Sequence, residues 1–508
     1  MNPIRRIVIV GGGTAGWMSA AALSKLLLRD EGLHRWEIEL VESDEIGIIG
    51  VGEATIPAIK AFNTAVGISE DEFLRETQGT FKLGIEFVNW GGLGQRYFHG
   101  FAPIGQPLDG IPFHHHWLRL KRAGAATELD EYAINNMAPR RARFMRPRAD
   151  MAGSPLAEIA HAFHFDAGRY ARYLRRLGEQ RGVKRTEGRI QSVQRDAESG
   201  LLAGLTLADG RTVRGDFFFD CSGLHALLID KTLGVPFEDW THWLPCDRAQ
   251  AVPCASAATL LPHTRSTAHG AGWQWRIPLQ HRIGNGHVYS SSFLSDDDAA
   301  RTLLSHLDGQ PLAEPRVIRF RTGRRATPWV GNCLAVGLSS GFLEPLESTS
   351  IHLVQSAITR FMDLFPHGRL DAVDIDEYNR QAAFEMQRIR DFIVLHYKLT
   401  ARSDTEFWNY CRNMPVPDTL QAKMALFASN GRIYREGTEL FTEASWLQVM
   451  LGQGLEPRGY HPLVEQRSLS QVGAWADNLR DVTRRCVDVM PMHADFIAAN
   501  CAATSHMP

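Results

Sequence analysis

The sequence predicts an α/β fold built around a parallel sheet. Residues 6–10 form a short β-branched run, an Ala- and Leu-rich helical stretch (14–28) follows a glycine turn, and a second strand is expected at 37–41. Strand, helix and strand in this order favour parallel pairing with a right-handed crossover. Turn signals at 198–200 and 208–210 separate three later strands, as in a β-meander.

Further elements extend this core. Asp166 is expected to cap a helix through Leu177, and the apolar run 216–223 ends in small residues, like a return strand. A βαβ unit, a meander and a return strand together predict a Rossmann-like FAD-binding domain of the glutathione-reductase type. Prolines and tryptophans make 236–278 look irregular, whereas 351–500 has a mostly helical pattern with one long helix at 374–399.

These parts are expected to interleave on one body, because no flexible linker separates them. The FAD-binding module is predicted in three pieces, and a mostly helical part covers the substrate. The expected segments are 1–110, 166–235 and 331–365 for the FAD-binding module, 111–165 for an insertion near the substrate, 236–330 for a substrate-side sheet, and 366–508 for the helical substrate-covering region.

Composition excludes several classes of protein. The formal net charge is 55 − 57 = −2, whereas a protein built mainly to hold nucleic acid needs a concentrated positive surface. We find no run of about 20 uninterrupted apolar residues, so no membrane span is expected. The seven cysteines are scattered, odd in number and without a CxxC pair, which fits a reducing cytoplasm. No metal site is expected either, because the histidine run 114–116 lacks acidic or cysteine ligands at suitable spacing.

A glycine motif follows the first strand directly. A first glycine permits the tight turn, a second lets the backbone approach a pyrophosphate, and a third lets the helix pack on the strand. The residues of this turn are Gly11, Gly13, Thr14, Ala15 and Gly16. Glu42, at the end of the second strand, can accept hydrogen bonds from a ribose. An ordinary glycine turn is the alternative, and the motif alone does not distinguish FAD from NAD. The meander and the later stretch with Gly337 and Leu338 favour FAD.

The loop G-I-I-G-V-G-E-A-T-I-P (47–57) surrounds one acid, Glu53, with glycines and a proline. Such a loop allows close backbone approach and movement, so we expect a strap beside the cofactor, with contacts from Val51, Gly52, Glu53 and Ala54. A loop without a function is the alternative.

Five motifs, in this order and spacing, resemble the flavin-dependent tryptophan halogenases. They are GGGTAGW (11–17), GVGEATIP (50–57), TFKLGIEFVNW (80–90), GWQWRIPL (272–279) and GFLEPLESTS (341–350). The W-x-W-x-I-P stretch (273–278) is the signature that separates this family from flavin hydroxylases with the same FAD domain. The resemblance covers residues 4 to 400 well and the rest loosely.

The resemblance implies a two-component FAD-dependent halogenase. A separate flavin reductase would supply reduced FAD (FADH2), which forms a flavin hydroperoxide with dioxygen; halide attack would then give hypohalous acid. Lys82 matches the lysine that receives this oxidant, by hydrogen bond or as a haloamine, and an apolar setting would lower its pKa. Glu347 matches the residue that polarises the oxidant or takes the proton from the arenium ion. The structural alternatives are a snorkelling surface lysine and a helix-capping glutamate.

The family binds halide at the backbone amides that match Thr349 and Ser350. The second position is usually glycine there. We expect the Cβ of Ser350 to resist a positive φ and to crowd the anion nest, which leaves chloride or bromide open.

On the substrate side, His99 and Phe101 match the aromatic positions that sandwich an indole. Trp446 and Leu447 stand where halogenases of free tryptophan carry a tyrosine pair, in a loose alignment. Apolar side chains cannot satisfy a buried ammonium and carboxylate, so an indole without the zwitterion, or one within a larger molecule, is expected. The two signature tryptophans are expected to keep the arene away from the flavin.

The predicted function is therefore electrophilic halogenation, chlorination or bromination, of an indole-type arene. A flavin-dependent aromatic monooxygenase and a non-catalytic flavin-binding redox protein are the alternatives. The expected partners are a small aromatic substrate, halide, a flavin reductase and a second copy in a homodimer, without nucleic acid or membrane.

Overall fold

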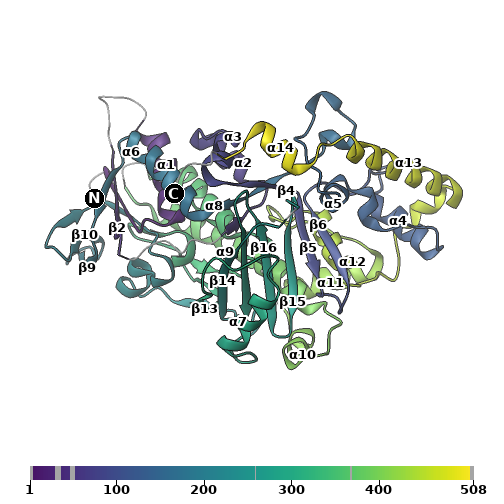
Figure 1. Cartoon of the computed structure of the whole chain (residues 1–508). Coiled ribbons are helices and arrows are strands. Elements are labelled where there is room, and N and C mark those ends of the chain that lie inside the picture. The colour runs from purple at the N-terminus through teal and green to yellow at the C-terminus, as the bar shows by residue number, and fades with distance from the viewer. Residues whose placement is uncertain (1–3, 29–35, 46–51, 258, 367–368, 504–508) are drawn as a thin grey trace.

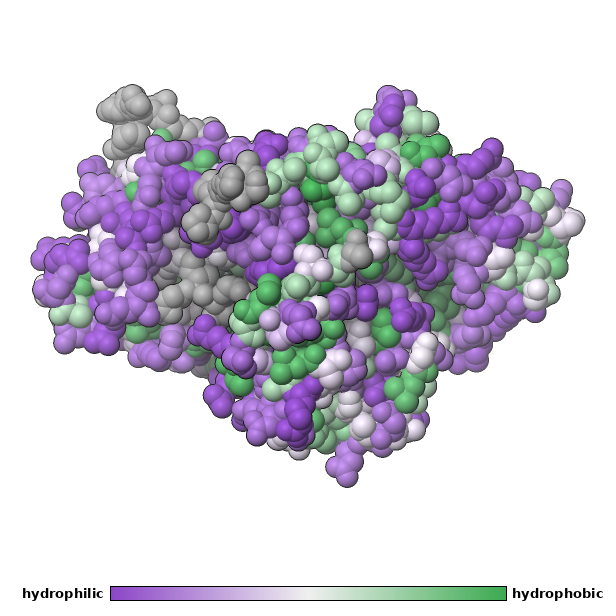
Figure 2. Space-filling model, viewed as in Figure 1, coloured by the Kyte–Doolittle hydropathy of each residue, from purple (hydrophilic) through white to green (hydrophobic). Residues whose placement is uncertain are grey.

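The computed structural model describes residues 4–28, 36–45, 52–257, 259–366 and 369–503. The first half of the predicted strap, including Val51, therefore lies outside the described residues. Figure 1 shows one body in which the N-terminal sheet, at the left, adjoins a central, mostly antiparallel sheet, with α12 (Glu443–Gly452) and α13 (Leu469–Asp488) at the right. Figure 2 shows mostly hydrophilic residues over the left part of this face. Among the described residues, no helix is both long and apolar enough to cross a membrane.

The predicted parallel sheet is present and has six strands in the described part of the chain. Its order is β20-β21-β12-β1-β2-β8, with parallel pairing except between β20 and β21. The strands are β1 (Arg6–Val10), β2 (Glu37–Glu42), β8 (Lys184–Glu187), β12 (Phe217–Asp220), β20 (Trp329–Val330) and β21 (Cys333–Ala335). The helices α1 (Thr14–Leu27), α6 (Ala167–Gln180) and α8 (Ser350–Asp363) belong to the same module. Asp166 caps α6 as predicted, since its Oδ1 accepts from the backbone N–H of Arg169 at 2.9 Å.

The predicted meander is confirmed as an antiparallel sheet in the order β11-β10-β9. Its strands are β9 (Ile190–Arg195), β10 (Leu202–Leu207) and β11 (Thr212–Arg214), so the two turn signals lie between them. Together with the parallel sheet, it gives the FAD-binding architecture that was expected.

Residues 236–278 are more regular than the sequence suggested. They contribute to a seven-stranded sheet, order β18-β14-β17-β16-β15-β5-β6, in which β15 and β5 run parallel. The strands are β5 (Gly84–Val88), β6 (Arg96–Gly100), β14 (Arg248–Cys254), β15 (Thr264–His269), β16 (Gly272–Pro278), β17 (Ile283–Tyr289) and β18 (Arg316–Arg319). Every residue of β16 and β17 is buried, so neither strand shows the alternation that marks a half-exposed strand.

Two small antiparallel sheets link these units. In one, β3 (Gly52–Ala54) and β4 (Thr80–Lys82) both pair with β7 (Ala162–Asp166), which joins the described end of the strap to the strand that carries Lys82. The other has the order β13-β19-β22, with β13 (Phe237–Asp239), β19 (Gly323–Arg325) and β22 (Gly341–Phe342).

The C-terminal region is helical, as predicted. Its long helix α9 spans Ala372–Lys398, close to the expected 374–399. The remaining helices are α2 (Ile59–Val66), α3 (Glu70–Thr77), α4 (Phe113–Arg122), α5 (Ile134–Arg140), α7 (Asp296–Ser305), α10 (Glu406–Asn413), α11 (Asp418–Asn430), α12 (Glu443–Gly452), α13 (Leu469–Asp488) and α14 (His493–Asn500). One apolar core contains residues from Ile4 to Cys501, which explains why the modules interleave.

Candidate active site

The glycine turn after β1 leaves space for a dinucleotide. Gly11 has φ +109°, and a Cβ there would lie 2.3 Å from the carbonyl oxygen of Cys221. A Cβ on Gly16 would lie 1.8 Å from the carbonyl oxygen of Gly11, so helix and turn are in close contact. A Cβ added to Gly13, by contrast, would meet no protein atom within 4 Å. Gly13 is the N-cap residue of α1, and no side chain caps this end of the helix. Uncapped N–H groups facing open space fit a pyrophosphate.

Two further elements border this turn. Gly337 follows β21 with φ +74°, and its Cβ would lie 2.9 Å from the Cβ of Ala15, so only glycine allows this approach. Glu42 ends β2, accepts a hydrogen bond from Arg185 Nε at 2.5 Å, and places its carboxylate against the backbone of Gly12. These residues fit FAD, with contacts to Leu338 and Glu53 remaining predictions. Burial raises the pKa of Glu53, on the strap, to about 7.

Lys82 is fully buried and held by two hydrogen bonds. Its Nζ donates to the carbonyl oxygen of Thr55 on the strap at 3.0 Å and to Ser348 Oγ at 2.8 Å. The ring centroid of Phe101 lies 5.3 Å from the same nitrogen. Burial lowers the pKa of Lys82 to about 7, and the negative charge of Glu347 limits that fall. This side chain is therefore not a snorkelling surface lysine.

Glu347 ends the 3₁₀ turn Pro345–Glu347 and is also fully buried. His99 Nδ1 lies 2.9 Å from its Oε2, and His396 Nε2 lies 2.8 Å from its Oε1. Burial alone would raise the pKa of this carboxyl group, but the two imidazoles outweigh it and hold the pKa at about 2. Glu347 caps no helix, because Thr349 is the N-cap of α8. Its neighbour Ser348 connects it to Lys82.

The turn before α8 corrects one expectation. Ser348 has φ +60°, whereas Ser350 is the first residue of α8 and is not among the positive-φ residues of the described chain. The expectation that the Cβ of Ser350 would resist a positive φ is therefore wrong, since the left-handed position lies two residues earlier. Thr349 Oγ1 is buried without a hydrogen-bond partner among the described residues, and the first turn of α8 carries no acid. Halide binding at Thr349 and Ser350 remains a prediction.

Comparison with known proteins decides the family. The model of the tryptophan halogenase family matches residues 6–468. The chain belongs to the tryptophan halogenase family. It is 34% identical to tryptophan 7-halogenase RebH of Lentzea aerocolonigenes, over 97% of this chain and 98% of that protein.

Solved structures agree with the family match. Xcc4156, a flavin-dependent halogenase from Xanthomonas campestris, has a TM-score of 0.95 and 47% identity over 99% of this chain and 100% of that one. BrvH, a flavin-dependent halogenase from Brevundimonas sp. BAL3, has a TM-score of 0.93 and 47% identity, over 98% of this chain and 99% of that one. The predicted enzyme class, fold and use of a flavin are confirmed.

The aromatic side of this halogenase lies around His99. The centroid of the His99 ring lies 6.3 Å from that of Phe101, 5.6 Å from that of Phe392 and 6.3 Å from that of Phe441. Phe392 and Phe441 stack with centroids 3.8 Å apart, whereas Trp446 packs edge-on against Phe392 at 4.9 Å. Phe441 is thus a candidate substrate contact that the sequence reasoning missed. The role of Trp446 as a substrate contact stays a prediction.

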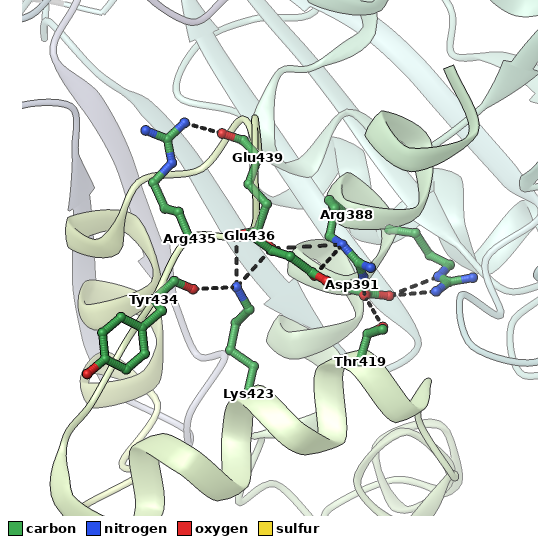
Figure 3. A network of polar contacts seen from close by, with 9 residues as sticks. Arg388, Asp391, Thr419, Lys423, Tyr434, Arg435, Glu436 and Glu439 are labelled. Atoms are coloured by element: carbon green, nitrogen blue, oxygen red, sulfur yellow. Dashed lines mark hydrogen bonds and ion pairs between the residues drawn. The ribbon is translucent and has the colours of Figure 1, made fainter. Parts of the chain in front are cut away.

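Charged side chains of α9, α11 and the segment 435–439 are paired with one another (Figure 3), and one of them, Lys423, lies beside Trp446. Lys423 on α11 lies 4.5 Å from the centroid of a Trp446 ring and donates to both carboxylate oxygens of Glu439, at 2.9 and 2.8 Å. Arg388 on α9 pairs with Asp391 at 2.9 Å and with Glu436 at 3.0 Å. Lys423 and Arg388 therefore each have a buried carboxylate partner, Glu439 and Asp391.

The signature tryptophans of the halogenase lie on β16. Trp273 Nε1 donates to Glu344 Oε2 at 2.9 Å, and Tyr397 OH donates to the same oxygen at 2.5 Å. Trp275 lies against the backbone of Gly286, and Ile277 contacts the Cβ position of Gly52 at 3.4 Å. The motif therefore contacts both the strap and the turn that carries Glu347. Its predicted role in keeping the arene from the flavin is untested.

Proposed function

We propose that this halogenase performs electrophilic chlorination or bromination of an indole-type arene other than free tryptophan, with FADH2 supplied by a separate flavin reductase. The observation that carries the proposal is the burial of Lys82 and Glu347 in one site, where Lys82 donates to the hydroxyl of Ser348, the residue that follows Glu347. Reduced FAD, when bound, supplies the activation of dioxygen that converts halide to hypohalous acid. Gly11, Gly13, Gly16, Glu42 and Gly337 would hold it.

Lys82 suits halogen transfer because its pKa of about 7 leaves ammonium and free amine both populated at neutral pH. The ammonium can donate a hydrogen bond to hypohalous acid. The free amine has a lone pair that can take the halogen as a haloamine. Its two hydrogen bonds fix the nitrogen beside Phe101, so the oxidant would be held next to an aromatic surface.

Glu347 suits proton removal because its pKa of about 2 keeps it ionised at neutral pH. A halogenated arenium ion must lose a proton to regain aromaticity, and a positioned carboxylate can accept it. General-base assistance of this kind typically contributes about 10²- to 10⁴-fold.

The substrate class follows from the paired charges near Trp446. An amino-acid ammonium and carboxylate need free partners when buried, and their unpaired burial costs several kcal/mol. Lys423 and Arg388 already have carboxylate partners, so recruiting them would break buried ion pairs. The relative RebH is named a tryptophan 7-halogenase and the relative SttH a tryptophan 6-halogenase, so free tryptophan is the substrate against which the proposal is tested.

The test is product analysis by mass spectrometry after turnover with a flavin reductase. Indole, an N-acylated tryptophan amide and free tryptophan are each offered with chloride, with bromide and without halide. We expect halogenated indole with an isotope doublet, less halogenated tryptophan, and no product without halide. Hydroxylated product without halide would favour the monooxygenase, and wild-type inactivity would favour a non-catalytic flavoprotein. Equal or faster tryptophan halogenation would reject the substrate class.

A further inference from the structure

His396 lies between Glu347 and a phenol. Its Nε2 is 2.8 Å from Glu347 Oε1, and its Nδ1 is 2.8 Å from the hydroxyl of Tyr97. Tyr97 is on β6 and His396 near the end of α9, so elements almost 300 residues apart meet here. His396 and Glu347 are fully buried, and Tyr97 is nearly so.

The hydrogen-bonding capacity of these groups fixes their roles. Burial raises the pKa of Tyr97 well above its usual value, so the phenol keeps its proton and donates to His396 Nδ1. Burial also lowers the pKa of His396, although Glu347 opposes that shift, and a neutral imidazole has only one N–H. With Nδ1 accepting from Tyr97, that N–H is on Nε2, which lies 2.8 Å from Glu347 Oε1 in a polar contact without the alignment of a hydrogen bond.

Packing prevents the imidazole from turning away. Phe87 stacks on His396 with centroids 4.6 Å apart and on Tyr97 at 4.8 Å. Phe392 packs edge-on against His396 at 5.4 Å, and Gln453 Nε2 donates to its carbonyl oxygen at 2.7 Å. Such an arrangement of a buried ring and a partner on each nitrogen orients the group that it contacts.

We infer that Tyr97 and His396 are positioning residues for the halogenation step: the phenol fixes the imidazole tautomer, and the imidazole keeps its protonated Nε2 in contact with Glu347 Oε1, at 2.8 Å. The Glu347 carboxylate then has an imidazole on each oxygen, because His99 Nδ1 lies 2.9 Å from the other oxygen, Oε2. This inference rests on the proposed function, which makes Glu347 the proton acceptor. It explains how a fully buried carboxylate stays ionised and correctly aimed.

Other titratable groups around Glu347 bear on the test. His99 faces it from β6, and Lys82 acts on it from β4. The pH dependence of activity therefore contains Lys82 as well, so activity alone does not report on Glu347. An infrared titration of the carboxyl group does, because the protonated form has its own C=O band.

The experiment compares Tyr97→Phe with the wild-type flavoprotein. Phenylalanine keeps the ring stacked on Phe87 and removes the O–H, so the imidazole can carry its proton on Nδ1 and place the lone pair of Nε2 against Glu347 without turning. We expect kcat to fall by about tenfold or more, as for one lost hydrogen bond to a charged group, with the arene KM unchanged. We also expect one additional protonated-carboxyl band at mildly acidic pH, beyond those of Glu53 and Glu344, which the wild-type protein shares because burial raises the pKa of each to about 7. In Glu347→Gln/Tyr97→Phe, both the band and the additional loss of kcat should be absent.

Controls separate this role from a structural one. Tyr170→Phe removes an equally buried hydroxyl that donates to Asn63 Oδ1 at 3.0 Å, and it should leave kcat and the infrared titration unchanged. The inference is overturned if Tyr97→Phe shows no new carboxyl band, or if its loss of kcat is the same at every pH and adds to that of Glu347→Gln. Should Glu347→Gln itself react at the wild-type rate, the proposed function fails instead.

Discussion

Replacing Lys82 with methionine should remove the pH dependence that this lysine gives to the stability of the protein, and also its activity. Methionine has a similar length and no charge, so it fits the space of the lysine without an ammonium to desolvate. The folded-state pKa of about 7 lies below the usual 10.5, which means that the unfolded chain binds more protons between these two values. The stability of the wild-type protein therefore rises with pH across that window.

The pKa of Lys82 also gives the size of its pH-dependent contribution to the free energy of unfolding. The difference between 10.5 and about 7 corresponds to about 5 kcal/mol at about 1.4 kcal/mol per pKa unit, of which about 2 kcal/mol is lost between pH 7 and 9. Against this, the variant leaves the carbonyl oxygen of Thr55 and the hydroxyl of Ser348 without their donor, at a cost of about 1–3 kcal/mol each that does not depend on pH. The decisive quantity is thus the change with pH of the difference in free energy of unfolding between the variant and the wild type.

The assay is denaturant unfolding of both proteins at several pH values from 6.5 to 9. We expect the difference in free energy of unfolding, variant minus wild type, to be largest below pH 7 and to shrink by about 2 kcal/mol between pH 7 and 9. Glu347, with a pKa of about 2, does not titrate in this window. Lys184→Met, at a lysine whose side chain is 69% exposed, is the matched control and should show no such trend. A difference that stays constant with pH would refute the lowered pKa.

Three further predictions concern other parts of the site. Gly13→Ala should weaken flavin binding, measured by fluorescence titration, with an unchanged melting temperature, because the added methyl meets no protein atom within 4 Å; a large loss of stability would contradict this. Lys423→Met should lower the free energy of unfolding by about 3–5 kcal/mol, because it leaves Glu439 buried without its cation, and the double variant Lys423→Met/Glu439→Gln should recover much of that loss. Phe441→Ala should raise the KM for indole more than Trp446→Phe does, in steady-state assays, because Phe441 is the ring near His99; the reverse order would restore Trp446 as the main contact.

Local signals were sufficient for much of the fold. The glycine turn with Glu42, the two turns of the meander and the apolar period of α9 are short-range features, and each lies where it was expected. A substrate-side sheet was expected at 236–330, but its individual strands were not placed, because Gly272–Pro278 and Ile283–Tyr289 are buried along their whole length and do not alternate. A continuous buried run carries no period from which a strand can be identified.

The site was predicted where short motifs carry it and missed where distant residues meet. Lys82 and Glu347 come from motifs, and the structure brings them together through Ser348. Tyr97 and His396 have no local signature, since each is a single polar group in an apolar run and they meet only in the folded chain. The backbone at Ser350 was mispredicted because a φ angle depends on where the helix begins, and α8 begins one residue after its N-cap Thr349.

The central claim is that the halogen reaches the arene through Lys82. A single turnover tests it: wild-type protein and Lys82→Met are loaded with reduced FAD, mixed with dioxygen, bromide and indole, and followed by flavin absorbance and by mass spectrometry of quenched samples. The account predicts that Lys82→Met oxidises its flavin at close to the wild-type rate and forms no bromoindole. Bromoindole from Lys82→Met at the wild-type yield would contradict it.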